Sequence, residues 1–339
     1  MQRLTMKDIA RIAGVSVTTV SRALNDAPEM SRATKDRVLA ICREEGYRAN
    51  LLARSLISSR SNVIGVVLPD LTGPFHAALA LHIETLARER GYQVMLCNGR
   101  PEDVQVETLF GFLVGQRVDG ILLTSASNEA HELLDRYAPV MPSVLLGDPS
   151  PTDTALRVNA VSTDNYMGGR IGAEYLFRLG HRDVAYLGPR RGSVTHALRH
   201  QGFLSAAQDL GMRVHTLENP GRMSTLDHGY RLGRALFSAP FTQTAVFAPS
   251  DIMALGVMQA ADEAGLRIPQ DISLLGYDDI EYAALPKIRL TTIAQPTAKL
   301  AAAALELLLA LIGAEDRAGD HTHRLLMPAL VERDTCRKL

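Results

Sequence analysis

Three side chains of the types that bind polyols each follow an apolar run of this sequence. Phe75 follows "VVLP", Arg199 lies beyond "AYLG", and Asp278 closes "LLGYD". An arginine and a carboxylate can form paired hydrogen bonds with neighbouring hydroxyls, and an aromatic ring can cover the C–H face of a sugar. Together they predict a site for a small polyol effector.

Other polar residues stand at the ends of similar runs. Open α/β sheets bind ligands beyond the carboxyl ends of their strands, so these positions join the same expected site. Asp164 and Asp251 are equally suited to cap the helices that follow them. The expected effector-binding residues are Asp70, Thr72, Phe75, Ser125, Asp164, Arg199, Ser250, Asp251 and Asp278.

A positively charged group lies near Arg199 in the sequence. It would suit a sugar acid or a sugar phosphate, or else it belongs to the exposed surface. Its members are Arg190, Arg191, His196 and His200.

These positions require a framework of parallel strands, and the sequence from Val63 onward has that pattern. Uninterrupted apolar runs such as "VIGVVLP" and "DGILLT" alternate with helical stretches. Strands covered by helices on both faces have this composition. The alternation predicts an α/β fold with an open, doubly wound sheet, and a second series of the same kind begins after "NAVSTD".

Several classes of protein lack their necessary parts here. The chain has no G-x-S-x-G, no P-loop, no H-E-x-x-H and no dinucleotide fingerprint, so we expect no enzyme and no cofactor. The three cysteines have no metal-ligand spacing, and His321 and His323 alone predict no metal site. The N-terminus lacks a secretory signal and no apolar run is long enough for a membrane span, so we expect a cytoplasmic protein.

The first sixty residues differ from the rest in charge. They hold 11 Lys+Arg and 6 Asp+Glu, a net charge of +5, whereas the remainder holds 25 basic and 31 acidic residues, a net of −6. A compact basic segment on a mildly acidic body predicts an anionic partner for that segment alone. Nucleic acid is favoured over a membrane because no broad apolar face accompanies the charge.

Helical spacing within this segment predicts a helix-turn-helix. Thr5 and Asp8 form a capping pattern before a helix that ends at Gly14, Ser16 opens a second helix, and a third runs from about Ser31 to Glu45. The second helix would enter the major groove with Val17, Thr18 and Arg22 toward base edges. The remaining expected DNA contacts in this unit are Thr5, Ser16, Thr19, Ser21, Asn25 and Ser31, chiefly to phosphates.

The stretches "TMKDIARIAGVSVTTVSRALN" and "GYRANLLARSL" carry a specific resemblance. The chain resembles the lactose-repressor (LacI/GalR) family of bacterial transcription regulators over essentially its whole length. The resemblance implies that Val17 and Thr18 choose the operator and that a two-lobed, periplasmic-binding-protein-like (type I) effector domain follows. The implied units are a DNA-binding domain at 1–49, a hinge helix and linker at 50–61, and an effector and dimerisation domain at 62–339.

The same resemblance divides the effector domain into two lobes. The chain is expected to cross between them near residues 161–163, 290–293 and 319–321. The first lobe would then take residues 62–162 and 292–319, and the second lobe would take residues 163–290 and 320–339.

The segment "NLLARSLISSRSN" is too short to hold a helix alone in water. Asn50 can cap a helix that places Ala53 and Leu56 on one face and Arg54 on another. Its resemblance to the family's hinge helix implies a minor-groove contact, with Leu56 inserted at a base step and Asn50, Ala53 and Arg54 beside it.

The sequence therefore predicts a ligand-regulated transcription repressor, acting as a homodimer on a pseudo-palindromic operator. Its effector would be a sugar, a sugar acid or another sugar derivative that controls a catabolic operon. The absence of a leucine repeat before Leu339 favours a dimer over a tetramer. Two alternatives are a purine-type repressor that needs a corepressor, and a soluble sugar-binding module with no DNA role.

Overall fold

The computed structural model describes residues 4–24, 30–47, 60–99, 106–124, 128–149, 158–189, 192–219, 224–314 and 321–339. Its contacts divide the chain into two compact units, Met1–Ser61 and Asn62–Leu339. Each unit has a hydrophobic core of its own. Among the described residues, no helix is long and apolar enough to cross a membrane.

The described residues of the first unit form three helices, α1 (Met6–Ala13), α2 (Val17–Leu24) and α3 (Arg32–Glu44). Ile9, Val20 and Val38, one from each helix, are fully buried and form the centre of its core. Thr5 and Asp8 cap α1 reciprocally, as the sequence predicts, and Gly14 ends it with a φ of 63°. The expected contacts Asn25, Asn50, Ala53, Arg54 and Leu56 lie outside the described residues.

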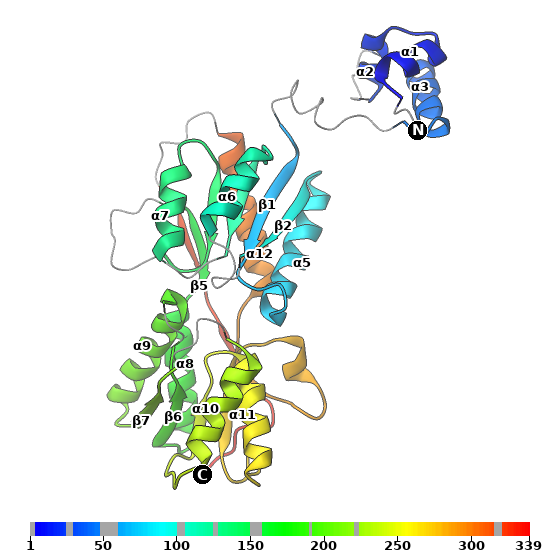
Figure 1. Ribbon diagram of the computed structural model, residues 1–339. Coiled ribbons are helices and arrows are strands. Elements are labelled where there is room, and N and C mark those ends of the chain that lie inside the picture. The colour runs from blue at the N-terminus through cyan, green and yellow to red at the C-terminus, as the bar shows by residue number, and fades with distance from the viewer. Residues whose placement is uncertain are drawn as a thin grey trace. The chain divides into compact units, whose positions relative to one another are not determined.

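The second unit contains two six-stranded sheets, one in each of two lobes (Figure 1). The first sheet is entirely parallel and the second is parallel except for its edge strand β12. The first sheet has the order β11 (His323–Leu326), β5 (Ala160–Thr163), β4 (Ser143–Leu146), β3 (Gly120–Leu123), β1 (Val63–Leu68) and β2 (Gln93–Asn98). The second has the order β12 (Ala329–Val331), β10 (Thr291–Ala294), β9 (Ser273–Asp278), β8 (Ala245–Phe247), β6 (Asp183–Leu187) and β7 (Arg213–Leu217).

Helices cover both faces of each sheet, which is why the strands are apolar throughout. The first lobe has α5 (Pro74–Glu89), α6 (Val106–Gly115), α7 (Asn128–Tyr137) and α12 (Thr297–Gly313). The second has α8 (Asn165–Arg178), α9 (Val194–Asp209), α10 (Leu226–Phe237) and α11 (Asp251–Glu263), with the short helix η1 (Glu281–Ala284). Figure 1 shows α12 beside α5, although more than 200 residues separate them along the chain.

The described chain crosses between the lobes three times, the first two close to the expected positions and the third later in the sequence. β5 remains in the first sheet as far as Thr163, and β10 remains in the second as far as Ala294. The crossing expected near 319–321 is misplaced, because β11 pairs with β5 in the first sheet and only β12 joins the second. The segment "HRLLMPALVERDT" thus holds one strand for each lobe, and Pro328 separates them.

Candidate functional site

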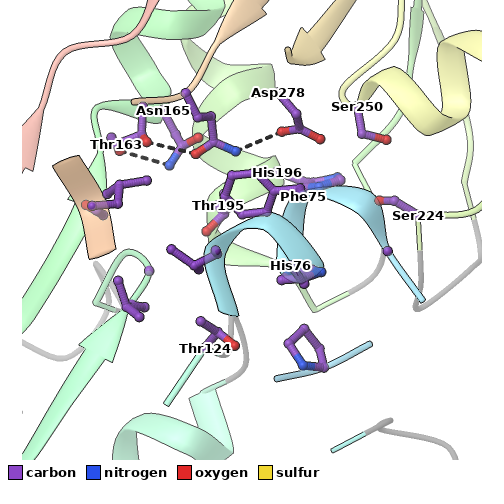
Figure 2. Close-up of a pocket in the computed structure, with 18 of the residues that line it drawn as sticks. Phe75, His76, Thr124, Thr163, Asn165, Thr195, His196, Ser224, Ser250 and Asp278 are labelled. Carbon is purple, nitrogen blue, oxygen red and sulfur yellow. Dashed lines mark hydrogen bonds between the residues drawn. The ribbon is translucent and has the colours of Figure 1, made fainter. Parts of the chain in front are cut away.

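A cavity of about 130 Å³ lies between the lobes, at the carboxyl ends of both sheets. Asp70, Phe75 and Thr124 line it from the first lobe, and Arg199 and Asp278 line it from the second. Figure 2 shows Phe75, Asp278 and Ser250 around this cavity. Three residues that the sequence singles out for polyol binding, Phe75, Arg199 and Asp278, are therefore brought together.

Arg199 is held in one position by contacts on several sides. Its Nε donates to Asn165 Oδ1 (2.8 Å) and its Nη1 donates to the Pro249 carbonyl (2.6 Å). Nη1 also lies 3.5 Å from Asp278 Oδ1, and the guanidinium carbon lies 3.7 Å from the centre of the Tyr277 ring. With only 3% of its surface exposed, Arg199 is fixed in place in the cavity wall, in an orientation suited to donate to a hydroxyl of a ligand.

Close packing of α8 against α9 explains how Arg199 reaches Asn165. Gly169 on α8 faces the carbonyl of Arg199, and Gly202 on α9 faces the carbonyl of Tyr166. A Cβ at either glycine would overlap those carbonyl oxygens. The glycines thus allow two helices of the second lobe to meet at the backbone, directly beside the site.

Asp278 connects the cavity to the crossings between the lobes. Gln295, just after β10, donates through Nε2 to Asp278 Oδ1 (2.7 Å). Its Oε1 accepts a hydrogen bond from the Thr163 hydroxyl (2.8 Å) at the end of β5. A ligand that binds Asp278 therefore contacts a chain of hydrogen bonds that includes two of the three crossings.

Two serine hydroxyls in the wall have no hydrogen-bond partner within the described structure. Ser250 Oγ and Ser224 Oγ are both buried, and Ser250 is only 3% exposed. Ser250 precedes α11 but its side chain does not cap that helix. A buried hydroxyl without a partner is costly, so both are suited to bind polar groups of a ligand.

Asp148 links the two lobes beside the cavity. It follows β4 of the first lobe and is 3% exposed. It accepts hydrogen bonds from Asn165 Nδ2 (2.7 Å) and from the Thr195 hydroxyl (3.0 Å), both in the second lobe. Burial raises the pKa of its carboxyl, and hydrogen bonds from Ser162, Thr195 and Asn165 oppose that rise.

Three expected effector contacts do not line the cavity. Asp164 caps α8 by accepting from the Met167 backbone N–H (2.9 Å). The Thr72 hydroxyl donates to Asp70 (2.7 Å), and Asp251 is fully buried beneath the site. Strand ends predict the neighbourhood but not the direction of a side chain, and Ser125 lies outside the described residues.

The wall also contains residues that strand-end reasoning did not select. Gln295 follows the run "LTTIA" directly and the same rule could have found it. Ser224 follows no strand, and no sequence signal marks it. The residues not predicted as contacts are His76, Thr124, Ser162, Thr163, Asn165, Thr195, Ser224 and Gln295, with several apolar neighbours.

Positive charge is less concentrated at the cavity than the sequence suggests. His196 does line it and is buried, but His200 points elsewhere, toward Thr216 (3.0 Å) and the Tyr186 ring. Arg190 and Arg191 lie outside the described residues. Among the described lining residues, Arg199 is the one arginine or lysine, and the carboxylates of Asp70 and Asp278 also line the wall, so the wall has no excess of positive charge for an anionic ligand.

The first unit presents the expected side chains on its surface. Val17, Thr18 and Arg22 are exposed on α2. Ser16 accepts from the Thr19 backbone N–H (3.0 Å), and Ser31 caps α3. These hydroxyls order helix starts, as Thr5 does, while Ser21 is partly buried on α2.

Comparison with known proteins identifies the family. The pattern of the bacterial regulatory proteins of the lacI family matches residues 5–50, and that of the periplasmic binding protein-like domain matches residues 173–336. The ribose operon repressor of Escherichia coli (strain K12) is 33% identical over 97% of this chain and 95% of its own length. The chain belongs to the lacI family. It is a DNA-binding transcription regulator and not an enzyme.

Other members of the lacI family are similar over their full length. The repressor CytR of Escherichia coli (strain K12) is 31% identical over 99% of this chain and 97% of its own. The lac repressor dimer bound to operator and the anti-inducer ONPF is 28% identical, with a TM-score of 0.87 over 99% of this chain and all of that one. A lacI-family regulator from Enterococcus faecalis V583 with bound ribose is 30% identical, with a TM-score of 0.70 over 82% of this chain and 99% of that one.

Proposed function

We propose that this regulator represses a carbohydrate catabolic operon in the cytoplasm and is released from its operator by a neutral monosaccharide, for which D-ribose is the first candidate. The observation that carries the proposal is the cavity wall itself. It combines a fixed arginine, a carboxylate, an aromatic ring and buried hydroxyls without partners. The ribose named for the relatives agrees with this chemistry.

The size and charge of the cavity support a single neutral sugar ring. A dry cavity of about 150 Å³ in another protein accommodates benzene, so a cavity of about 130 Å³ suits one ring better than a disaccharide. Arg199 already pairs with Asp278, and Asp70 adds a second carboxylate to the wall, which disfavours a sugar acid or a sugar phosphate.

DNA binding in this proposal uses α2 and a second copy of the chain. Val17 and Thr18 would contact base edges in the major groove, and Arg22 would bind guanine. The hinge residues Asn50, Ala53, Arg54 and Leu56 would bind the minor groove. A pseudo-palindromic operator requires two-fold symmetry, hence a homodimer.

Exposed apolar side chains support the homodimer. Leu81 on α5 and Leu96 on the edge strand β2 are 64% and 44% exposed. Tyr282 and Leu285 in the second lobe are 40% and 46% exposed. Apolar groups at such positions are suited to burial against a second subunit.

The decisive experiment measures operator affinity by fluorescence anisotropy with a panel of D-ribose, other neutral monosaccharides, sugar acids, sugar phosphates and purines. We expect one neutral monosaccharide to weaken operator binding about 10-fold or more, within the usual range of allosteric coupling. A purine that tightens binding would instead support the corepressor alternative. If no compound changes the affinity, the sugar proposal is wrong.

A matched pair of variants tests the site. Arg199→Lys should weaken the binding of the active sugar, because lysine cannot reproduce the fork that contacts Asn165 and Pro249. Arg213→Lys, at a side chain 80% exposed on β7, should leave it unchanged. Equal effects of both changes would contradict the assignment of this cavity.

A further inference from the structure

The turn that carries Asp278 has an unusual backbone. Asp278 has a φ of 115° and Asp279 has a φ of 57°. Side chains with a Cβ disfavour these values, and conformations of this kind persist only where the surrounding structure holds them. Besides Gln295 in the cavity wall, two residues outside the wall contact this turn or the residue that follows it.

Asp251 holds the residue that follows the turn. Its carboxylate lies at the start of α11 and is fully buried. Oδ2 accepts from the Ile280 backbone N–H (2.9 Å), and Oδ1 accepts from the Thr292 hydroxyl on β10 (2.6 Å). The position of Ile280 is therefore tied both to a helix and to a neighbouring strand.

Arg333, just beyond β12, holds the turn from another side. Its Nη2 donates to Asp279 Oδ1 (2.7 Å) and its Nη1 donates to the Leu290 carbonyl (2.8 Å). Its backbone N–H donates to the Thr291 hydroxyl (3.0 Å). The Arg333 side chain is 13% exposed, so this forked contact is largely shielded from water.

These contacts determine where the Asp278 carboxylate lies. With Asp279 and Ile280 held, Oδ1 of Asp278 lies 2.7 Å from Gln295 Nε2 and 3.5 Å from Arg199 Nη1. Relaxation of the turn to negative φ would rotate the Asp278 backbone and move the carboxylate away from both partners.

We propose that Asp251 and Arg333 are positioning residues, which hold the Asp278–Asp279 turn in the conformation needed to bind the effector. Neither residue lines the cavity. The effect on sugar binding rests on the proposed function, whereas the holding of the turn can be measured without any ligand.

The ligand-free experiment is hydrogen–deuterium exchange on the full-length protein. In Arg333→Gln we expect the amides of residues 277–281 to exchange about 10-fold faster, because one side of the turn is released. Asp279→Asn removes the same ion pair from the other partner and should act alike. Arg289→Gln is the control, because it breaks the nearby ion pair with Asp334 (2.6 Å), which does not contact the turn. Unchanged exchange in both Arg333→Gln and Asp279→Asn would overturn the proposal.

The second experiment titrates D-ribose by calorimetry and operator DNA by anisotropy. We expect the ribose dissociation constant to rise about 10-fold in Arg333→Gln and less in Arg333→Lys, while operator affinity without sugar stays unchanged. Asp251→Asn keeps an acceptor for the Ile280 N–H and should bind ribose with unchanged affinity. Asp251→Ala removes that acceptor and should bind ribose more weakly.

The two experiments have separate consequences. Failure of the wild-type protein to bind D-ribose would count against the proposed effector and leave the exchange experiment to decide the role of Arg333. Faster exchange in Arg333→Gln with unchanged ribose affinity would show that the turn does not need to be held for binding, and would overturn the positioning role.

Discussion

Asp251 shows how a single residue can be essential to a site without touching the ligand. Burial raises the pKa of its carboxyl well above its ordinary value, and the nearby Asp278 raises it further. The folded protein therefore binds the proton at this carboxyl more tightly than the unfolded chain does. It follows that the contribution of Asp251 to stability falls as pH rises from the ordinary pKa of a carboxyl through the raised folded value.

We expect Asp251→Asn to stabilise the protein at pH 7 by about 1 to 3 kcal/mol, because the amide carries no charge, its oxygen can still accept from the Ile280 N–H, and its nitrogen can donate to the Thr292 hydroxyl. The gain should shrink toward pH 4, which urea unfolding across the pH range would measure. Asp271→Asn should instead destabilise the protein at pH 7, because hydrogen bonds from Arg267 lower the pKa of that exposed carboxyl in the folded protein. A uniform loss of stability in Asp251→Asn at every pH would contradict this account.

The sequence predicted some of the residues that line the cavity but not others. Arg199, Phe75 and Asp278 were found because strand ends and polyol chemistry agree on them. Asp164 and Asp251 occupy equivalent sequence positions, yet one caps a helix and the other lies beneath the wall. The direction of a side chain at a strand end depends on tertiary packing, which the local pattern does not contain.

At the scale of elements, the α8–α9 contact positions Arg199. We expect Gly202→Ala to lower the free energy of unfolding by about 1 to 3 kcal/mol, because the added Cβ would push α9 away from the Tyr166 carbonyl on α8. Sugar binding should weaken as well, because Arg199 lies on α9. Chemical denaturation and calorimetry would measure the two effects.

Gly111→Ala on α6 is the matched control. Nothing lies within 4 Å of the Cβ that it would add, so alanine should be neutral or stabilise the helix by about 0.5 to 1 kcal/mol. A Gly202→Ala variant as stable as Gly111→Ala would show that α8 and α9 can separate freely.

The pattern of elements was largely predictable, whereas their assignment to lobes was less so. Uninterrupted apolar runs identified the strands because both faces of each sheet are covered. The same runs do not reveal which sheet a strand joins. β11 and β12 lie in different lobes because of their pairing partners β5 and β10, which are distant in sequence.

At the scale of the whole molecule, the two units have separate cores and should unfold separately. We expect calorimetry to show two transitions, because Met1–Ser61 is small enough to be marginally stable by itself. The active sugar should raise the transition temperature of Asn62–Leu339 only. At a concentration 100 times its dissociation constant, it should increase the free energy of unfolding of that unit by about 2.7 kcal/mol. A single transition that shifts as a whole would show that the units are coupled.

The late position of α12 and β11 has a consequence for the order of synthesis. Leu300, Leu305 and Leu308 of α12 cover one face of the first sheet, and β11 forms its edge. α12 is complete only at residue 313 and β11 only at residue 326, whereas α1, α2 and α3 of the DNA-binding unit are complete by residue 44. A growing chain therefore contains the complete DNA-binding unit long before the first lobe of the effector domain is complete. A chain terminated before residue 326 would contain the DNA-binding unit without a complete first sheet.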